Sequence, residues 1–341
     1  MTRVLVYELL CSRAEVRPAG ETPWASALSG EGWAMLAAAV EDFRRAAGVE
    51  VATLLDERWR PDAEGRWPDV AVRWVEPGGE PDAFRAAAAA ADFALVIAPE
   101  FDRLLETRCR WAEAAGCRLL GPSPDAVALT ADKLGLARDL ERAGVPTPAT
   151  VSWIQTVTGF PPLPWVVKPR YGAGSQDTRL VTDPRSALPY GPLGEMVVQP
   201  YVPGQPASVA FLIGPRQTIA LAPAAQHISD DGHFHYLGGQ APLPEPLAGR
   251  AVRIARRAVD AVPGLGGYVG VDVVLGEADD GTGDRVIEIN PRLTTSYIGL
   301  RALAVDNLME LLLRVARGEP AAEPRWRPGV VSWTADGDVL T

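Results

Sequence analysis

Two stretches near the C-terminus combine apolar, strand-like residues with oxygen-bearing side chains. Asp272 lies in Gly-Tyr-Val-Gly-Val-Asp-Val-Val-Leu, and Glu288 and Asn290 lie in Val-Ile-Glu-Ile-Asn-Pro-Arg. Residues i and i+2 of a strand share one face, roughly 7 Å apart, so Glu288 and Asn290 can point to a place that Asp272 reaches from a neighbouring strand. Such oxygens suit Mg²⁺ held together with substrate phosphates. Because buried carboxylates are costly without a cation, we predict a magnesium site here rather than a solvated polar face.

A lysine and a glycine-rich turn could bind phosphate. Lys168 ends the apolar run Trp-Val-Val-Lys, and Gly172-Ala-Gly-Ser follows it closely. Glycines let a backbone approach a polyphosphate without a side-chain clash. The turn lacks the G-x-x-x-x-G-K-[ST] pattern of a P-loop, and an ordinary hairpin turn would explain it equally well. Lys133 opens a predicted helix, where an exposed lysine is the commoner outcome.

The predicted strands and helices that must position these residues follow two different patterns along the chain. In the first third, strands and helices alternate, which indicates a parallel sheet covered by helices. No G-x-G-x-x-G follows the first strand, so a dinucleotide site has no support there. The predicted strands are Arg3–Leu9, Val49–Leu55, Phe93–Ala98 and Arg118–Leu120, and the predicted helices are Gly32–Ala47, Pro81–Ala91 and Phe101–Ala115.

From about Trp165 onward, short strands separated by Gly and Pro indicate antiparallel pairing. Ser123 is a predicted helix N-cap. The predicted strands are Val166–Lys168, Thr178–Val181, Met196–Gln199, Ala207–Ile213, Thr218–Ala222, Tyr268–Leu275 and Arg285–Ile289, with an edge strand at Val330–Trp333, and the predicted helices are Ala131–Ala143, Leu247–Val262 and Asp306–Arg317. We therefore expect an α/β unit over residues 1–122, a central lobe over 123–205, a C-terminal lobe over 206–320 and a tail over 321–341.

The composition is that of a globular protein with more than one compact unit: 341 residues, 47% hydrophobic and 22% charged. A net charge of −10 argues against a general nucleic-acid binder. Three cysteines without metal-ligand spacing fit a reducing compartment. The longest apolar run, Ala86 to Ala91, is too short to span a bilayer. We expect a cytoplasmic protein without membrane or nucleic-acid partners, and a homodimer is compatible with the sequence.

The order of these motifs resembles the ATP-grasp superfamily across residues 123–318, with the run Glu288-Ile-Asn-Pro-Arg as its most specific part. The resemblance implies a mixed α/β and α+β architecture in which a Rossmann-like domain precedes two lobes that grip ATP between antiparallel sheets. It implies ATP and Mg²⁺, or Mn²⁺, as cofactors.

The resemblance also implies a role for each matching residue. It assigns ATP contacts to Lys133, Lys168, Gly172, Ala173, Gly174, Ser175, Gln199, Tyr201 and Val202, with residues 172–176 as a mobile loop over the phosphates. It assigns the metal to Asp272, Glu288 and Asn290, and the charge of the transferring phosphoryl group to Lys168 and Arg292. Because they follow the metal ligands, Thr294, Thr295, Ser296, Tyr297 and Arg301 are our candidates for orienting the acid substrate.

Two positions depart from the superfamily pattern. Many members hold the ribose with a glutamate after the hinge glycine, but this chain reads Gly204-Gln205-Pro206-Ala207, so another group or Gln205 must do so. Some peptide ligases carry an arginine two residues before the first metal aspartate, where this chain has Gly270. This second loss makes Arg292 the better candidate for contacting an acyl phosphate.

Two longer stretches, beginning at Gln199 and at Asn290, are similar to the tyramine–glutamate ligases of methanofuran biosynthesis. This resemblance implies an ADP-forming ligase that joins glutamate to an aromatic amine or amino acid through an acyl phosphate. The implied pathway is synthesis of a one-carbon cofactor related to methanofuran, methylofuran or tetrahydromethanopterin. A small-molecule kinase and a nucleotide-binding regulatory protein without turnover remain as alternatives.

All three histidines, His227, His233 and His235, lie in one polar segment. A zinc site there would need a fourth ligand with suitable spacing, and none is evident. We expect an exposed loop near the substrate, in which one histidine contacting substrate or phosphate is the secondary interpretation.

Overall fold

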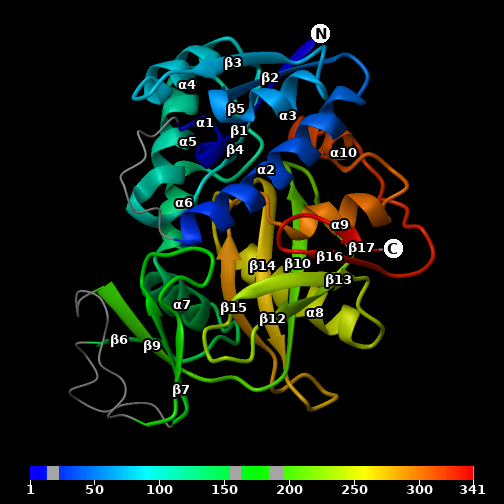
Figure 1. Cartoon of the computed structure of the whole chain (residues 1–341). Helices are drawn as coiled ribbons and strands as arrows, with labels where there is room; N and C mark the ends of the chain where they lie inside the picture. The colour runs from blue at the N-terminus through cyan, green and yellow to red at the C-terminus, as the bar shows by residue number, and fades with distance from the viewer. Residues whose placement is uncertain (14–22, 154–162, 184–194, 341) are drawn as a thin grey trace.

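The structure is a computed structural model that describes residues 1–13, 23–153, 163–183 and 195–340, with side chains of its first long helix described from residue 29. It contains a five-stranded parallel sheet, a four-stranded antiparallel sheet and an eight-stranded antiparallel sheet. Figure 1 shows the parallel sheet stacked above the large antiparallel sheet, with the small sheet beside the large one. The predicted fold class is confirmed.

The N-terminal unit has the strand order β3-β2-β1-β4-β5. Its strands are β1 Thr2–Glu8, β2 Val49–Asp56, β3 Ala71–Val75, β4 Phe93–Ile97 and β5 Arg118–Leu119, and its helices are α1 Leu9–Ser12, α2 Pro23–Arg44, α3 Arg60–Glu64, α4 Glu80–Ala89 and α5 Leu104–Ala114, with single 3₁₀ turns at Glu57–Trp59 and Phe101–Arg103. The central strands β1 and β4 are buried on both faces, which explains their continuous apolar runs. The edge strand β3 was not predicted, because Arg73 interrupts its apolar run.

Two short helices connect the first unit to the small sheet. They are α6 Pro124–Ala131 and α7 Lys133–Arg142. The predicted N-cap is confirmed, because Ser123 accepts a hydrogen bond from the Ala126 N–H. Asp132 caps α7 by accepting from the Leu134 and Gly135 N–H groups, and so separates the two helices. The small sheet has the order β6-β9-β7-β8, formed by β6 Val151–Ser152, β7 Trp165–Pro169, β8 Arg179–Val181 and β9 Met196–Pro200.

The large sheet has the order β15-β14-β10-β12-β13-β16-β17, with β11 beside β10. Its strands are β10 Gln205–Ile213, β11 Thr218–Ala220, β12 Ala224–Ile228, β13 Tyr236–Ala241, β14 Gly267–Leu275, β15 Arg285–Asn290, β16 Val331–Thr334 and β17 Val339–Leu340, and its helices are α8 Leu247–Ala261, α9 Ser296–Leu303 and α10 Leu308–Ala316. One face packs against α8 through Ala251, Ile254 and Ala255. Tyr268 and Leu212 belong to a second core that includes residues of α2, α9 and α10.

The last residues extend the large sheet. The predicted edge strand is confirmed as β16, which pairs with β13. Trp333 of β16 is buried against Gly299 of α9, where an added Cβ would lie 1.8 Å from the indole ring. Residues 331–340 therefore pack with the C-terminal lobe, while the exact domain boundaries stay predictions. Within the described residues, no helix has both the length and the apolar character needed to cross a membrane.

Candidate active site

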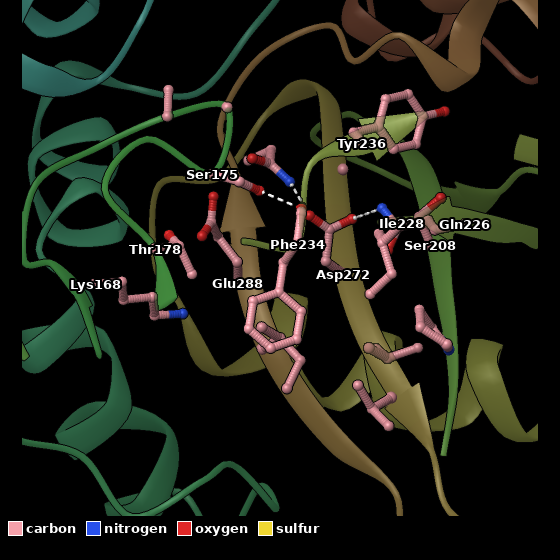
Figure 2. A pocket seen from close by; sticks show the side chains of 18 of the residues that line it. Lys168, Ser175, Thr178, Ser208, Gln226, Ile228, Phe234, Tyr236, Asp272 and Glu288 are labelled. Atoms are coloured by element: carbon pink, nitrogen blue, oxygen red, sulfur yellow. Dashed lines mark hydrogen bonds between the residues drawn. The ribbon is translucent and has the colours of Figure 1, made fainter. Parts of the chain in front are cut away.

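Three oxygen-bearing side chains meet on adjacent strands at the cleft between the two antiparallel sheets. Asp272 of β14 is paired in register with Glu288 of β15. The Nδ2 of Asn290, at the end of β15, donates to Asp272 Oδ2 at 2.8 Å. Figure 2 shows Asp272 and Glu288 facing one cavity, with hydrogen bonds to Asp272 drawn as dashed lines. The structure thus brings the three predicted metal ligands together.

Gln226 belongs to this cluster and was not predicted from the sequence. Its Nε2 donates to Asp272 Oδ1 at 2.8 Å, from strand β12 on the opposite side of β10. Burial, followed by the negative charge of Glu288, raises the pKa of Asp272 to about 6. Burial would also raise the pKa of Glu288, but the charges of Lys133 and Lys168 outweigh it and leave that pKa below its usual value. The cluster therefore concentrates negative charge that a cation would stabilise.

The donor set fits magnesium shared with a nucleotide. Among the described residues, no group of three or more His, Cys, Asp or Glu side chains lies close enough to hold a metal without other ligands. Here two carboxylates and one amide oxygen are available, and Mg²⁺ commonly takes one or two carboxylates together with phosphates and water. The three histidines are exposed, and His233 and His235 stack with ring centroids 5.7 Å apart.

Two lysines reach the cavity from different elements. Lys133, the first residue of α7, donates from Nζ to the Gly172 carbonyl at 2.7 Å and lies 3.4 Å from Glu288 Oε2. Lys168 of β7 is buried, and burial together with the charge of Lys133 lowers its pKa to about 8 despite the nearby carboxylates. Both ammonium groups lie beside the acidic cluster, where a polyphosphate would need positive charge.

The glycine-rich loop, residues 172–176, is tied to the hairpin between β12 and β13. Ser175 Oγ donates to the Phe234 carbonyl at 2.8 Å, and the Leu180 N–H donates to the Gly232 carbonyl at 2.7 Å. Figure 2 shows Ser175 on one side of the cavity and Phe234 in its centre. Gly172, Ala173, Gly174 and Ser175 all line the cavity. The loop therefore covers the cleft from the small-sheet side.

Apolar side chains also line the cavity, among them Val166, Ile228 and Ile287. Gln199, Tyr201 and Val202 line it as well, as predicted for an adenine site. Gln199 Nε2 donates to Thr150 Oγ1 at 2.8 Å. Gly204 has φ +146°, and a Cβ there would lie 2.3 Å from the Leu275 carbonyl oxygen, so only glycine fits this strand crossing. Gln205 is exposed and is not among the lining residues, so the suggestion that it holds a ribose has no structural support.

Arg292 lies beyond the metal cluster and is held by the N-terminal unit. Its Nε is 2.8 Å from Glu100 Oε1, at the carboxyl end of β4. Burial would lower the pKa of Arg292, but Glu100 outweighs it and raises that pKa above its usual value. Thr294, Thr295 and Ser296 line the same region of the cavity, and Thr294 Oγ1 lies 2.9 Å from Ser296 Oγ. Glu100 was not predicted from the sequence, because nothing local connects it with Arg292.

Arg301 and Tyr297 do not line the cavity, which corrects our expectation that they orient the acid substrate. Arg301 Nε is 2.8 Å from Asp42 Oδ2, and its Nη2 is 3.2 Å from Glu41 Oε2. Tyr297 is buried and its hydroxyl donates to the Asp42 carboxylate. Both side chains therefore connect α9 to α2 through contacts with carboxylates of α2.

Comparison with known sequences and structures agrees with this geometry. The ATP-grasp domain family matches residues 130–296, and the pre ATP-grasp 3 domain family matches residues 49–127. A solved ATP-grasp superfamily protein from Archaeoglobus fulgidus is 25% identical, with a TM-score of 0.72, and the match covers 97% of this chain and 92% of that one. An L-amino acid ligase from Bacillus licheniformis shares the fold at 18% identity, with a TM-score of 0.70, over 97% of this chain and 79% of that one.

Among curated proteins, the tyramine–L-glutamate ligase of Methanocaldococcus jannaschii is 29% identical over 228 residues. That match covers 67% of this chain and 64% of the relative, so the chain matches less than two thirds of the relative's length. The corresponding ligase of Methanocaldococcus fervens is also 29% identical, over 67% of each chain.

Proposed function

Since the chain belongs to the ATP-grasp superfamily, we propose that it is an ADP-forming carboxylate–amine ligase that makes an amide bond through an acyl phosphate. The observation that supports this most is the convergence of Asp272, Glu288 and Asn290 with two lysines in the cleft between the small and large sheets. This arrangement places cation-binding oxygens beside phosphate-binding charge, as transfer of a γ-phosphoryl group requires.

Different residues of the cleft bind the base and the phosphates of ATP. Gln199, Tyr201 and Val202 bind the base, while Lys133, Lys168 and the loop backbone bind the phosphates. Magnesium on Asp272, Glu288 and Asn290 would neutralise phosphate charge when bound. No nucleophile from the protein is needed, because the carboxylate of the acid substrate attacks the γ-phosphorus directly.

Lys168 and Arg292 stabilise the negative charge of the transferring phosphoryl group. Each positive charge within about 4 Å of a phosphoryl oxygen contributes on the order of 4 kcal/mol at an effective dielectric of about 20. The amine then attacks the acyl carbon, the carbon–oxygen bond to phosphate breaks, and the nitrogen loses a proton. Because an acyl phosphate hydrolyses readily, closure of loop 172–176 over the cleft protects it from water.

We propose L-glutamate as the acid and an aromatic amine or aromatic amino acid as the acceptor, in the synthesis of a one-carbon cofactor. The support is the 29% identity with two tyramine–L-glutamate ligases. The hydroxyl groups of Thr294, Thr295 and Ser296, which line the cavity beside Arg292, offer hydrogen bonds to an acid substrate.

A product assay tests the proposal. The protein is incubated with Mg-ATP, L-glutamate and tyramine, tyrosine or a pterin carrying an amine, and ADP release is measured together with the mass of the products. Amide formation that requires both acid and amine supports the ligase. A stable phosphorylated product without an amine requirement would instead identify a kinase, and absence of ADP release with every combination would leave only nucleotide binding.

A further inference from the structure

The carboxylates that line the cavity differ in their ion-pair and hydrogen-bond partners. Glu288 lies 3.4 Å from Lys133 Nζ, and Asp272 accepts hydrogen bonds from Gln226 and Asn290. Glu31 also lines the cavity, but within the described ranges no lysine, arginine or histidine lies within ion-pair distance of it. Its nearest donor is Thr295 Oγ1, at the long distance of 3.5 Å from Glu31 Oε2. Glu31 is thus the one described cavity carboxylate left with only a weak hydrogen bond.

Glu31 enters the cavity from α2 of the N-terminal unit. Burial raises its pKa; Arg292 and Thr295 oppose this shift, and Asp336, in the turn between β16 and β17, adds to it. The positive charge of Arg292 does not offset the negative charge of Glu31, because Arg292 Nε already pairs with Glu100 Oε1 at 2.8 Å. Among the described residues at and around this end of the cavity, the carboxylates of Glu31, Glu100 and Asp336 therefore outnumber the guanidinium of Arg292.

This charge fits a cationic substrate. We propose that Glu31 binds the ammonium group of the amine substrate and accepts the proton that its nitrogen must lose before attack. The inference rests on the proposed ligase function and assigns its acceptor subsite. The ammonium N–H bond breaks and its proton passes to the Glu31 carboxylate. The neutral amine then forms the C–N bond, phosphate leaves with the electrons of the C–O bond, and the second nitrogen proton passes to solvent.

The neighbours of Glu31 indicate the class of amine. Tyr236 also lines the cavity, and its hydroxyl is fixed by Trp333 Nε1 at 2.8 Å. Burial raises the pKa of Tyr236, and the charges of Asp272 and Glu31 raise it further, so both carboxylates lie near its hydroxyl. An aromatic ring beside a carboxylate suits a primary amine with an aromatic body. An acceptor carrying a carboxylate next to its ammonium would meet Glu31 and Asp336, and Arg292, the arginine that lines the cavity among the described residues, is already paired with Glu100.

The test separates acyl-phosphate formation from amine capture. Hydroxylamine is uncharged at neutral pH and traps acyl phosphates as hydroxamates without needing an ammonium subsite. We compare the wild type and Glu31→Gln with Mg-ATP and L-glutamate, using either tyramine or hydroxylamine as acceptor. Glu41→Gln is the matched control, since Glu41 lies on the same helix and pairs with Arg66 and Arg301.

We expect Glu31→Gln to lower kcat/KM for tyramine by about ten- to a hundredfold, the effect of losing a hydrogen bond to a charged group. Its rate of hydroxamate formation should stay within about twofold of the wild type. Glu41→Gln should match the wild type with both acceptors. For the wild type, tyrosine should be a poorer acceptor than tyramine, because it carries a carboxylate on the carbon that bears the ammonium group.

Three results would overturn the inference in distinguishable ways. Unchanged tyramine kinetics in Glu31→Gln would remove Glu31 from amine binding. Equal loss with both acceptors would assign Glu31 to the acyl-phosphate step or to folding instead. If the wild type formed no hydroxamate, the proposed ligase function itself would fail, and the acceptor subsite would fail with it.

Discussion

Glu100 and Arg292 are 192 residues apart in the chain, and their side chains form an ion pair with Nε 2.8 Å from Oε1. Glu100 follows β4 of the parallel sheet, whereas Arg292 follows the metal strand β15. Ligands of open parallel sheets bind beside the carboxyl ends of the strands. Here an arginine of the C-terminal lobe pairs with a carboxylate at such an end, so the first unit directly orients a residue of the proposed catalytic site.

Glu100→Gln should leave Arg292 in place but less firmly oriented. Because the guanidinium is meant to stabilise the transferring phosphoryl group, we expect kcat to fall by about ten- to a hundredfold while KM for ATP changes little. Steady-state kinetics with L-glutamate and hydroxylamine measure both constants, and Glu100→Asp should recover part of kcat. A rise in KM for ATP at constant kcat would argue that Glu100 does not act through Arg292.

Glu288→Ala should abolish ATP turnover without unfolding the protein. The substitution removes one of two carboxylates of the proposed magnesium site and the ion-pair partner of Lys133. We expect a loss of at least about 10²- to 10³-fold in ADP release, with a retained circular dichroism spectrum. Glu277→Ala, at an exposed position after β14, is the matched control. Near-normal turnover in Glu288→Ala would remove the metal assignment.

Gln226→Leu tests whether the residue behind Asp272 supports the metal. Its Nε2 fixes Asp272 Oδ1 at 2.8 Å, and groups that orient a metal ligand commonly contribute about 10- to 100-fold to metal affinity. We expect the Mg²⁺ concentration for half-maximal ADP release to rise by that factor, and saturating Mg²⁺ to restore much of the rate. An unchanged Mg²⁺ dependence would contradict this role.

Arg301→Ala should affect stability and leave substrate binding unchanged. Removing the guanidinium leaves Asp42, which is 2% exposed, without this partner, so we expect a loss of about 2–4 kcal/mol in the free energy of unfolding. Arg325→Ala removes an exposed ion pair with Asp306 and should change stability by less than about 1 kcal/mol. Urea unfolding compares the two variants. A raised KM for glutamate in Arg301→Ala, without loss of stability, would return Arg301 to the substrate site.

The position of Arg301 shows where the sequence argument was limited. The sequence predicts substrate contacts for Thr294, Thr295, Ser296, Tyr297 and Arg301, but α9 begins at Ser296. Five residues later, at about 100° per residue, a helical side chain has turned well away from the starting face. Thr294, Thr295 and Ser296 therefore line the cavity, whereas Arg301 points to α2. The convergence of the metal residues could be predicted because spacing within a strand fixes the face on which a side chain lies.

The residues that sequence analysis missed come from distant elements. Gln226 lies on β12, which was not predicted because its neighbourhood is polar and is followed by the histidine segment. Glu31 and Glu100 belong to the N-terminal unit, and only the docking of that unit on the large sheet brings Glu31 to the cavity and Glu100 to Arg292 (Figure 1). Local periodicity carries no information about such docking, so a carboxylate on α2 looks like any other helix residue.

Glu8 gives the protein a pH-dependent stability that can be measured separately from activity. It ends β1, is 3% exposed, and accepts a hydrogen bond from the Cys11 N–H at 2.7 Å. Burial outweighs this hydrogen bond and the charge of Arg292, and raises the pKa of Glu8 from its usual 4.5 to about 7. Between these values the folded state binds more protons than the unfolded state, so stability decreases as the pH rises.

Above pH 7 the full cost of ionising Glu8 applies, up to about 3 kcal/mol. Glu8→Gln keeps an acceptor for the Cys11 N–H but cannot ionise, so its stability relative to the wild type should increase between pH 5 and pH 8. Urea unfolding at pH 5, 6.5 and 8 measures this difference, with Glu50→Gln at an exposed ion pair as the control that should show no such trend. A Glu8→Gln difference that is constant across this range would mean that the Glu8 carboxyl ionises in the folded protein as it does in the unfolded chain.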